Sequence, residues 1–146
     1  MNKKAEAFQH YLEADERRKS AFQIEEVKDD VQNTVVFRSA VIVEGQQLPT
    51  LVILDDSVFP IIRIQISPQV KKEDNELVLL RLSNDQNIKY KPFKLYFDAS
   101  GSLILDVCLL VPGEDYSKLG NEIYAMLEVL LNFLNESYRS IMKEIW

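Results

Sequence analysis

The chain has 146 residues, of which 47% are hydrophobic, and its 17 Lys+Arg against 23 Asp+Glu give a net charge of −6. This composition excludes an intrinsically disordered chain, and the length predicts one domain, residues 1–146, with a core large enough to fold without disulfides. The acidic balance argues against nucleic acid as a partner, because attraction to phosphate requires a basic surface.

Residues 3–19 are predicted to form one amphipathic helix. Apolar residues such as Phe8 and Leu12 recur there at spacings of three and four, with no glycine or proline between them. Asn2 is placed to cap the N-terminus of this helix. Positive charge at residues 17–19 would meet the negative end of the helix dipole, so this cluster is interpreted as a solvated helix end.

Between residues 21 and 67 the apolar residues alternate instead, which predicts a β-sheet. Strands are expected to begin near Phe22 and to include residues 34–44, 48–54 and 62–66. Turns rich in aspartate, asparagine and glycine separate these segments.

In the second half, the leucine-rich segment 75–87 is ambiguous between helix and buried strand, and its composition favours a helix. Residues 93–97 and 103–111 then alternate on either side of a turn in which Gly101 supplies the positive φ, which predicts a hairpin. Apolar residues from Leu119 almost to the C-terminus repeat at helical spacing. The chain is therefore predicted to be an α+β domain: an antiparallel sheet with N-terminal, middle and long C-terminal helices.

No common catalytic arrangement can be built from the sequence, so we expect a protein that is not an enzyme and holds no cofactor. His10 is the only histidine, no Gly-x-Ser-x-Gly elbow occurs, and four glycines cannot supply a phosphate-binding loop. The lone thiol, Cys108, shares a strand face with Ile104 and Leu110, a hydrophobic setting that predicts inert packing.

Two pairs of carboxylates, Asp29/Asp30 and Asp55/Asp56, leave one catalytic alternative open. If the fold brought them together they could bind a divalent metal ion and support a metal-dependent hydrolase, although each pair lies where a turn would place aspartate. A small-molecule sensor with an internal pocket is a further alternative.

The sheet has more apolar surface than a one-sided core requires. Strands 34–44 and 102–111 have aliphatic residues on both faces, whereas a sheet covered on one side should have a polar second face. The second face must be covered by the protein's own C-terminal helix or by a partner chain. Candidate interface residues on that face are Tyr96, Ile104, Cys108 and Leu110.

No stretch predicts a signal peptide or reaches the roughly 18 apolar residues of a membrane-spanning helix, so we expect a cytoplasmic protein without a membrane partner.

From about Lys72 to Lys143 the sequence resembles the YbjN-like family of bacterial sensory-transduction regulators, whose members are similar in fold to type III secretion chaperones. The resemblance rests on a helix ending in Leu82-Ser83-Asn84-Asp85-Gln86-Asn87, on Phe93-Lys94-Leu95-Tyr96-Phe97-Asp98 with Ser100-Gly101, on Leu103-Ile104-Leu105-Asp106-Val107, and on a long apolar helix with Tyr138 near its end.

The resemblance implies the element order α-β-β-β(β)-α-β-β-α and a domain that dimerises and binds proteins rather than catalysing a reaction. Chaperones of the similar fold wrap an extended client segment over apolar surfaces, and an acidic body would suit a basic client. The expected function is thus a non-catalytic, chaperone-like protein-binding module, and the expected partners are a client protein and a second copy.

Overall fold

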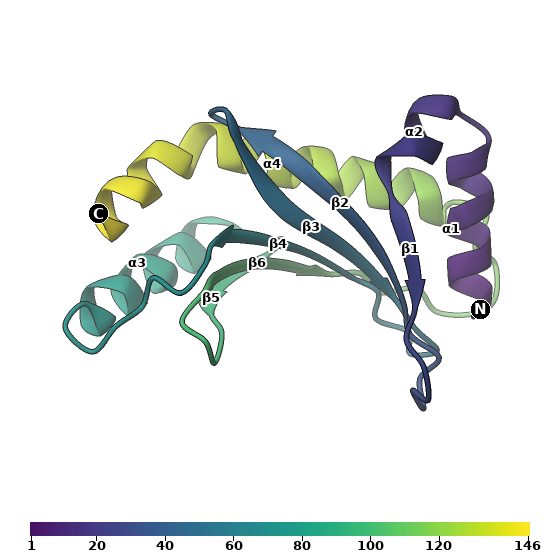
Figure 1. Ribbon diagram of the computed structural model, residues 1–146, viewed down its shortest axis with the longest axis horizontal. Coiled ribbons are helices and arrows are strands. Elements are labelled where there is room, and N and C mark those ends of the chain that lie inside the picture. Colours follow the sequence, from purple (N-terminus) through teal and green to yellow (C-terminus); the bar gives the residue numbers. More distant parts are fainter.

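The computed structural model describes residues 1–146 as six strands in one antiparallel sheet and four helices (Figure 1). In chain order the elements are α1 (Lys3–Glu13), α2 (Glu16–Ala21), β1 (Gln23–Glu26), β2 (Val35–Val43), β3 (Gln46–Leu54), β4 (Ile61–Ser67), α3 (Glu76–Lys89), β5 (Lys94–Phe97), β6 (Leu103–Cys108) and α4 (Leu119–Ile145). The predicted α+β class is confirmed, as is the sequence of helix, strands, helix, hairpin and long C-terminal helix. None of the helices is long and apolar enough to cross a membrane.

The prediction of one helix over residues 3–19 is wrong, because the helix divides at Asp15. The Asp15 side chain accepts hydrogen bonds from the backbone amides of Arg17 and Arg18 and so caps a second short helix, α2. The predicted cap at Asn2 is confirmed: its Oδ1 accepts from the Ala5 amide at 2.9 Å. The Asn2 Nδ2 also donates to the carbonyl of Leu54 at 2.9 Å, which ties the start of α1 to the end of β3.

The strands follow the order β1-β2-β3-β4-β6-β5, with every neighbouring pair antiparallel. β4 and β6 lie side by side although α3 and β5 separate them in the sequence. This pairing joins the N-terminal meander to the C-terminal hairpin in a single sheet.

One face of the sheet forms the core against α1 and α4, which lie on the same side of the sheet in Figure 1. Phe8 of α1 meets Phe37 of β2 edge to face, with ring centroids 4.9 Å apart. Ile64 and Leu105, which are paired across β4 and β6, are fully buried in the same cluster. The alternation of each strand therefore directs one set of side chains into the core and the other set away from it.

α3 packs beside β5 at the end of the sheet rather than over the sheet's second face (Figure 1). Asn87 of α3 holds the outer edge of β5: its Nδ2 donates to the Leu95 carbonyl at 2.9 Å, and its Oδ1 accepts from the Leu95 amide at 2.7 Å. Phe93, just before β5, contacts Phe133 of α4 with ring centroids 4.4 Å apart. These contacts place α3 and the hairpin against the long C-terminal helix.

Candidate functional site

The second face of the sheet, which we call the open face, has no helix over it. The strand registers place an apolar row across it, since Val36 lies opposite Ile53, Ile53 opposite Ile61, and Ile61 opposite Cys108. Backbone hydrogen bonds from Leu109 to Pro60 and from Val111 to Val58, both 2.8 Å, extend the pairing of β4 with β6 and bring Phe59 opposite Leu110. We call this set the open-face patch: Val36, Ile53, Phe59, Ile61, Cys108 and Leu110.

The open-face patch is exposed mainly at one end. Leu110 and Phe59 are 65% and 52% exposed, whereas Val36 is shielded by its neighbours although it lies outside the main core cluster. Large side chains so exposed on a sheet face indicate an interaction surface more strongly than scattered single residues do.

The four predicted interface residues do lie on the open face, but they do not form one exposed cluster. Cys108 and Leu110 belong to the open-face patch. Ile104 is only 5% exposed because Gln65 and Tyr96 flank it on the neighbouring strands, so it offers little surface to another chain. Tyr96 is half-buried and its hydroxyl is already hydrogen-bonded within the protein.

The expectation that Cys108 is a packed thiol is wrong, because this cysteine is exposed. Its strand neighbours are apolar, as the sequence indicated, but no helix covers the face to which it points. An apolar strand face is buried only where another element packs against it.

A buried polar cluster lies next to the open-face patch, and the sequence analysis missed it. Asp106 is 6% exposed and pairs with Arg63 in a two-point ion pair, with Nε to Oδ1 at 2.8 Å and Nη2 to Oδ2 at 2.9 Å. The Tyr96 hydroxyl donates to Asp106 Oδ2 at 2.8 Å. A lone aspartate within the apolar run of β6, and a lone arginine within that of β4, were the available signals.

The contacts in this cluster raise the pKa values of Arg63 and Tyr96. The hydrogen bond with Asp106 raises the pKa of Arg63 above its ordinary value, so the guanidinium stays charged. Burial raises the pKa of Tyr96, and the hydrogen bond to Asp106 raises it further, so the phenol stays neutral. A charged guanidinium and a neutral phenol provide orientation rather than a proton-transfer group near neutral pH.

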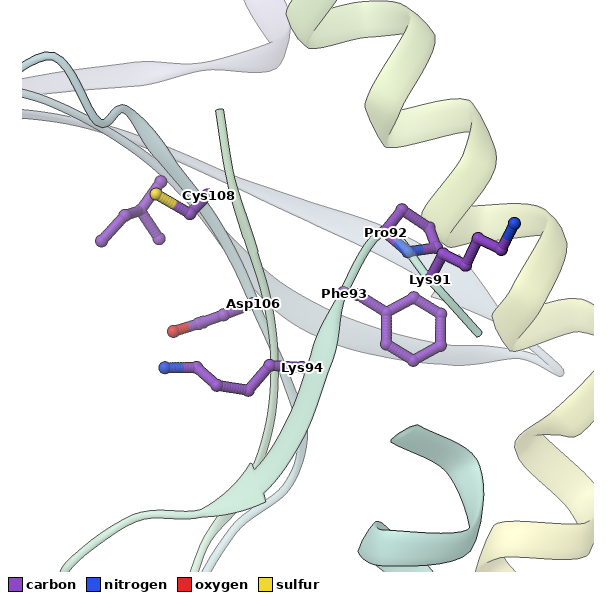
Figure 2. Close-up of a pocket in the computed structure, with 7 residues that line it drawn as sticks. Lys91, Pro92, Phe93, Lys94, Asp106 and Cys108 are labelled. Atoms are coloured by element: carbon purple, nitrogen blue, oxygen red, sulfur yellow. The ribbon is translucent and has the colours of Figure 1, made fainter. Parts of the chain in front are cut away.

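A pocket of about 390 Å³ opens beside this cluster, and Figure 2 shows Cys108, Asp106 and Lys94 pointing to the same side of the strands. Phe93 points to the opposite side, toward the helices (Figure 2). Lys94 lines the pocket without an ion-pair partner, and its ammonium lies 4.8 Å from the centroid of the Tyr96 ring. The Lys91 side chain extends away from Cys108 and Asp106, on the side of Phe93 (Figure 2). Because Arg63 already neutralises Asp106, this part of an acidic protein is locally cationic.

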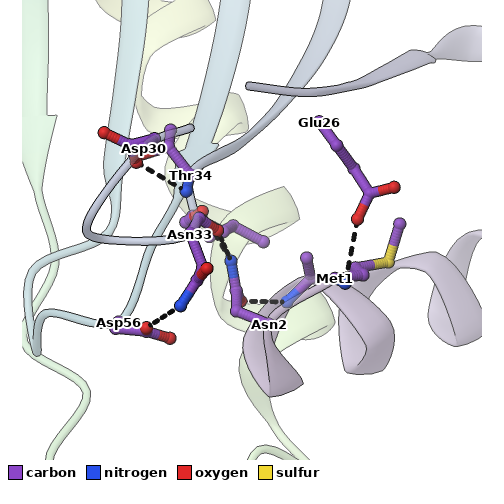
Figure 3. Close-up of polar contacts among 9 residues, drawn as sticks. Met1, Asn2, Glu26, Asp30, Asn33, Thr34 and Asp56 are labelled. Carbon is purple, nitrogen blue, oxygen red and sulfur yellow. Dashed lines mark hydrogen bonds and ion pairs between the residues drawn. The ribbon is translucent and has the colours of Figure 1, made fainter. Parts of the chain in front are cut away.

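The two aspartate pairs are engaged in turns, as Figure 3 shows for Asp30 and Asp56. Asp30 accepts from the Thr34 amide at 2.8 Å, and hydrogen bonds with Thr34 lower its pKa. Asp56 accepts from the Asn33 side chain, and Asp55 accepts from both the amide and the hydroxyl of Ser57. No three His, Cys, Asp or Glu side chains are grouped so that they could hold a metal ion.

A second apolar surface, unexpected from the sequence, lies on the outer side of α3. Leu79, Leu82 and Gln86 face inward and are buried. Leu77, Leu80 and Ile88 fall on the opposite side of the helix and are exposed. We call these three residues the α3 stripe.

Compared with known proteins, the sequence matches no family model and no curated protein.

Proposed function

We propose that the protein is a non-catalytic protein-interaction module that binds a partner through the open face of its sheet. The observation that carries the proposal is the open-face patch, in which Phe59 and Leu110 stand opposite each other and largely exposed on a sheet face without a helix. Burial of such side chains would contribute roughly 1.5–3 kcal/mol each to binding.

The charges beside the patch indicate the partner's chemistry. Lys94 is free of ion pairs next to the apolar row, so the surface favours an apolar segment flanked by aspartate or glutamate. The net charge of −6 alone pointed to a basic client, but the partner meets the local surface rather than the total charge.

The resemblance to the YbjN-like regulators supports the same proposal, because it implies a domain that binds proteins and forms a homodimer. The α3 stripe offers a surface for that dimer, since Leu77, Leu80 and Ile88 lie on one side of a single helix. A two-fold axis could pair the stripe with that of a second copy.

Partner binding is tested by capture from a bacterial lysate on the immobilised protein, followed by identification of the retained proteins. The double variant Phe59→Ser, Leu110→Ser should lose the partner that the unmodified protein retains. Val31→Ser is the matched control, because Val31 is 91% exposed in a turn outside the patch and its replacement removes a similar apolar side chain. Retention of no partner at micromolar concentration, or equal retention by the double variant, would contradict the proposed function.

Dimerisation is tested separately by light scattering on the purified protein. We expect a mass of twice 16.9 kDa, reduced to the single-chain mass by Leu80→Glu with Ile88→Lys. Val129→Lys, which changes an exposed apolar residue on α4, should leave the dimer intact. An unmodified protein that is strictly monomeric at micromolar concentration would refute the homodimer.

A further inference from the structure

The edge of β2 is only half covered. β1 pairs only with Val35–Arg38, and its first residue, Gln23, lies opposite Arg38, while β3 pairs with β2 along its whole length. The hydrogen bond from the Val27 amide to the Thr34 carbonyl, 2.9 Å, fixes which β2 residues direct their backbone groups toward β1. By the alternation of an antiparallel ladder, the next residues that direct their amides and carbonyls to this side are Ala40 and Ile42. Both are exposed, and no strand accepts or donates there.

An apolar groove of about 560 Å³ lies directly beside this uncovered edge, between β2 and α4. Its lining is mostly aliphatic and aromatic and includes Phe22, Ser39, Val41, Tyr124, Leu127 and Leu131. Ser39 and Val41 belong to the helix-covered face of β2, so the groove is separate from the open-face patch.

The geometry points to a β-strand addition site: we propose that an extended segment of a partner protein pairs with β2 along Ser39–Val43 and continues the line of β1. The main-chain groups of Ala40 and Ile42 would supply the hydrogen bonds. Alternate side chains of the added strand would point to the helix-covered side, where the groove offers Phe22, Tyr124 and Leu131 as apolar contacts. The uncovered edge requires an extended backbone, and the groove on one side of it requires an apolar side chain at every second residue. Only the two together select this ligand.

A charged residue in the groove indicates which charge the bound segment should have. Glu128 lines the groove, is exposed, and forms no ion pair. The occupant is therefore a segment with apolar residues at every second position and a lysine or arginine that reaches Glu128. A second copy that pairs through its own Ser39–Val43 edge is a poorer match, because that segment contains no lysine or arginine to reach Glu128.

The test is selection of binders from a display library of random peptides on the immobilised full-length protein. Enriched peptides should show alternating apolar residues with lysine or arginine, and synthetic copies should bind with an affinity that Glu128→Gln lowers. The substitution Ala40→Pro removes an edge amide and should weaken binding by about tenfold or more, while Ala40→Val, which keeps that amide, should not. Proline is tolerated at a strand edge whose N–H faces solvent, and circular dichroism checks that the variant is folded.

A second variant tests the groove without altering the strand. Ala125 is an exposed groove residue of α4, and Ala125→Lys should abolish binding, whereas Asn135→Lys, on the same helix outside the lining, should not. Enriched peptides without alternation, no enrichment at all, or equal binding by Ala40→Pro and Ala125→Lys would overturn the proposal. So would light scattering that shows a dimer lost on Ala40→Pro, because the edge would then be occupied by a second copy.

Discussion

At the scale of single residues, Asp106 is held in place by two partners that come from different strands. Its side chain is almost fully buried, and Arg63 supplies the opposite charge while Tyr96 supplies a further hydrogen bond. Burial of a carboxylate costs free energy unless the charge is paired. Loss of Arg63 would therefore destabilise the protein mainly because the Asp106 carboxylate would stay buried without a counter-charge.

We expect Arg63→Leu to lower the free energy of unfolding by about 3 kcal/mol, because the Asp106 carboxylate would be buried without a counter-charge. The double variant Arg63→Leu, Asp106→Leu should recover most of that loss. Arg38→Leu is the control, because the pair of Arg38 with Glu25 is about half exposed on both sides and should be worth less than about 1 kcal/mol. Urea unfolding followed by circular dichroism measures all three, and equal losses for Arg63→Leu and Arg38→Leu would contradict this interpretation.

At the scale of elements, α3 closes one edge of the sheet through a side chain rather than a strand. The Asn87 amide binds both backbone groups of Leu95, in the manner of a neighbouring strand, and so leaves β5 without a free pairing site at that residue. The contrast with β2 is informative, because Ala40 and Ile42 have no such side chain opposite them.

Replacement of Asn87 by alanine should therefore destabilise the protein by about 2 kcal/mol, because two partly buried hydrogen bonds are lost. Asn84→Ala, at an exposed position of the same helix, should be neutral or slightly stabilising, since alanine has the higher helix propensity. Hydrogen exchange at the Leu95 amide should accelerate in Asn87→Ala relative to Asn84→Ala. Unchanged exchange would show that Asn87 does not protect this edge.

At the scale of the whole molecule, the first and last helices meet where α4 begins. Gly120 is buried there, and a Cβ at this position would overlap the Tyr11 ring of α1. The absence of a side chain thus permits the close approach of two helices that lie at opposite ends of the sequence.

Gly120→Ala tests this closure by the sign of its effect. In an ordinary helix position the change would stabilise by about 1 kcal/mol, but here the overlap with Tyr11 should destabilise by about 1–3 kcal/mol. Thermal unfolding should show a lower midpoint for Gly120→Ala and an almost unchanged one for Asn121→Ala, the exposed neighbouring position. A raised midpoint for Gly120→Ala would mean that Tyr11 moves aside at little cost.

The local elements were predictable because their signals are local. Alternation or helical spacing located most strands and the long C-terminal helix, Asn2 and Gly101 marked a helix start and a turn, and the aspartate pairs proved to be turn residues. The prediction of one continuous helix through Asp15 was wrong, and this error also has a local cause, since a residue that caps one helix ends the helix before it.

Which sheet face is covered was decided only by tertiary packing. The sequence showed that β2 and β6 have two apolar faces, but it could not say that α1 and α4 would take the same side and leave Cys108 exposed. Arg63 and Asp106 are 43 residues apart, and β1 pairs with β2 only as far as Arg38, five residues short of the end of β2 at Val43, so neither the ion pair nor the uncovered edge leaves a local pattern. Periodicity determines which side chains share a face, whereas long-range contacts between elements determine what lies against that face.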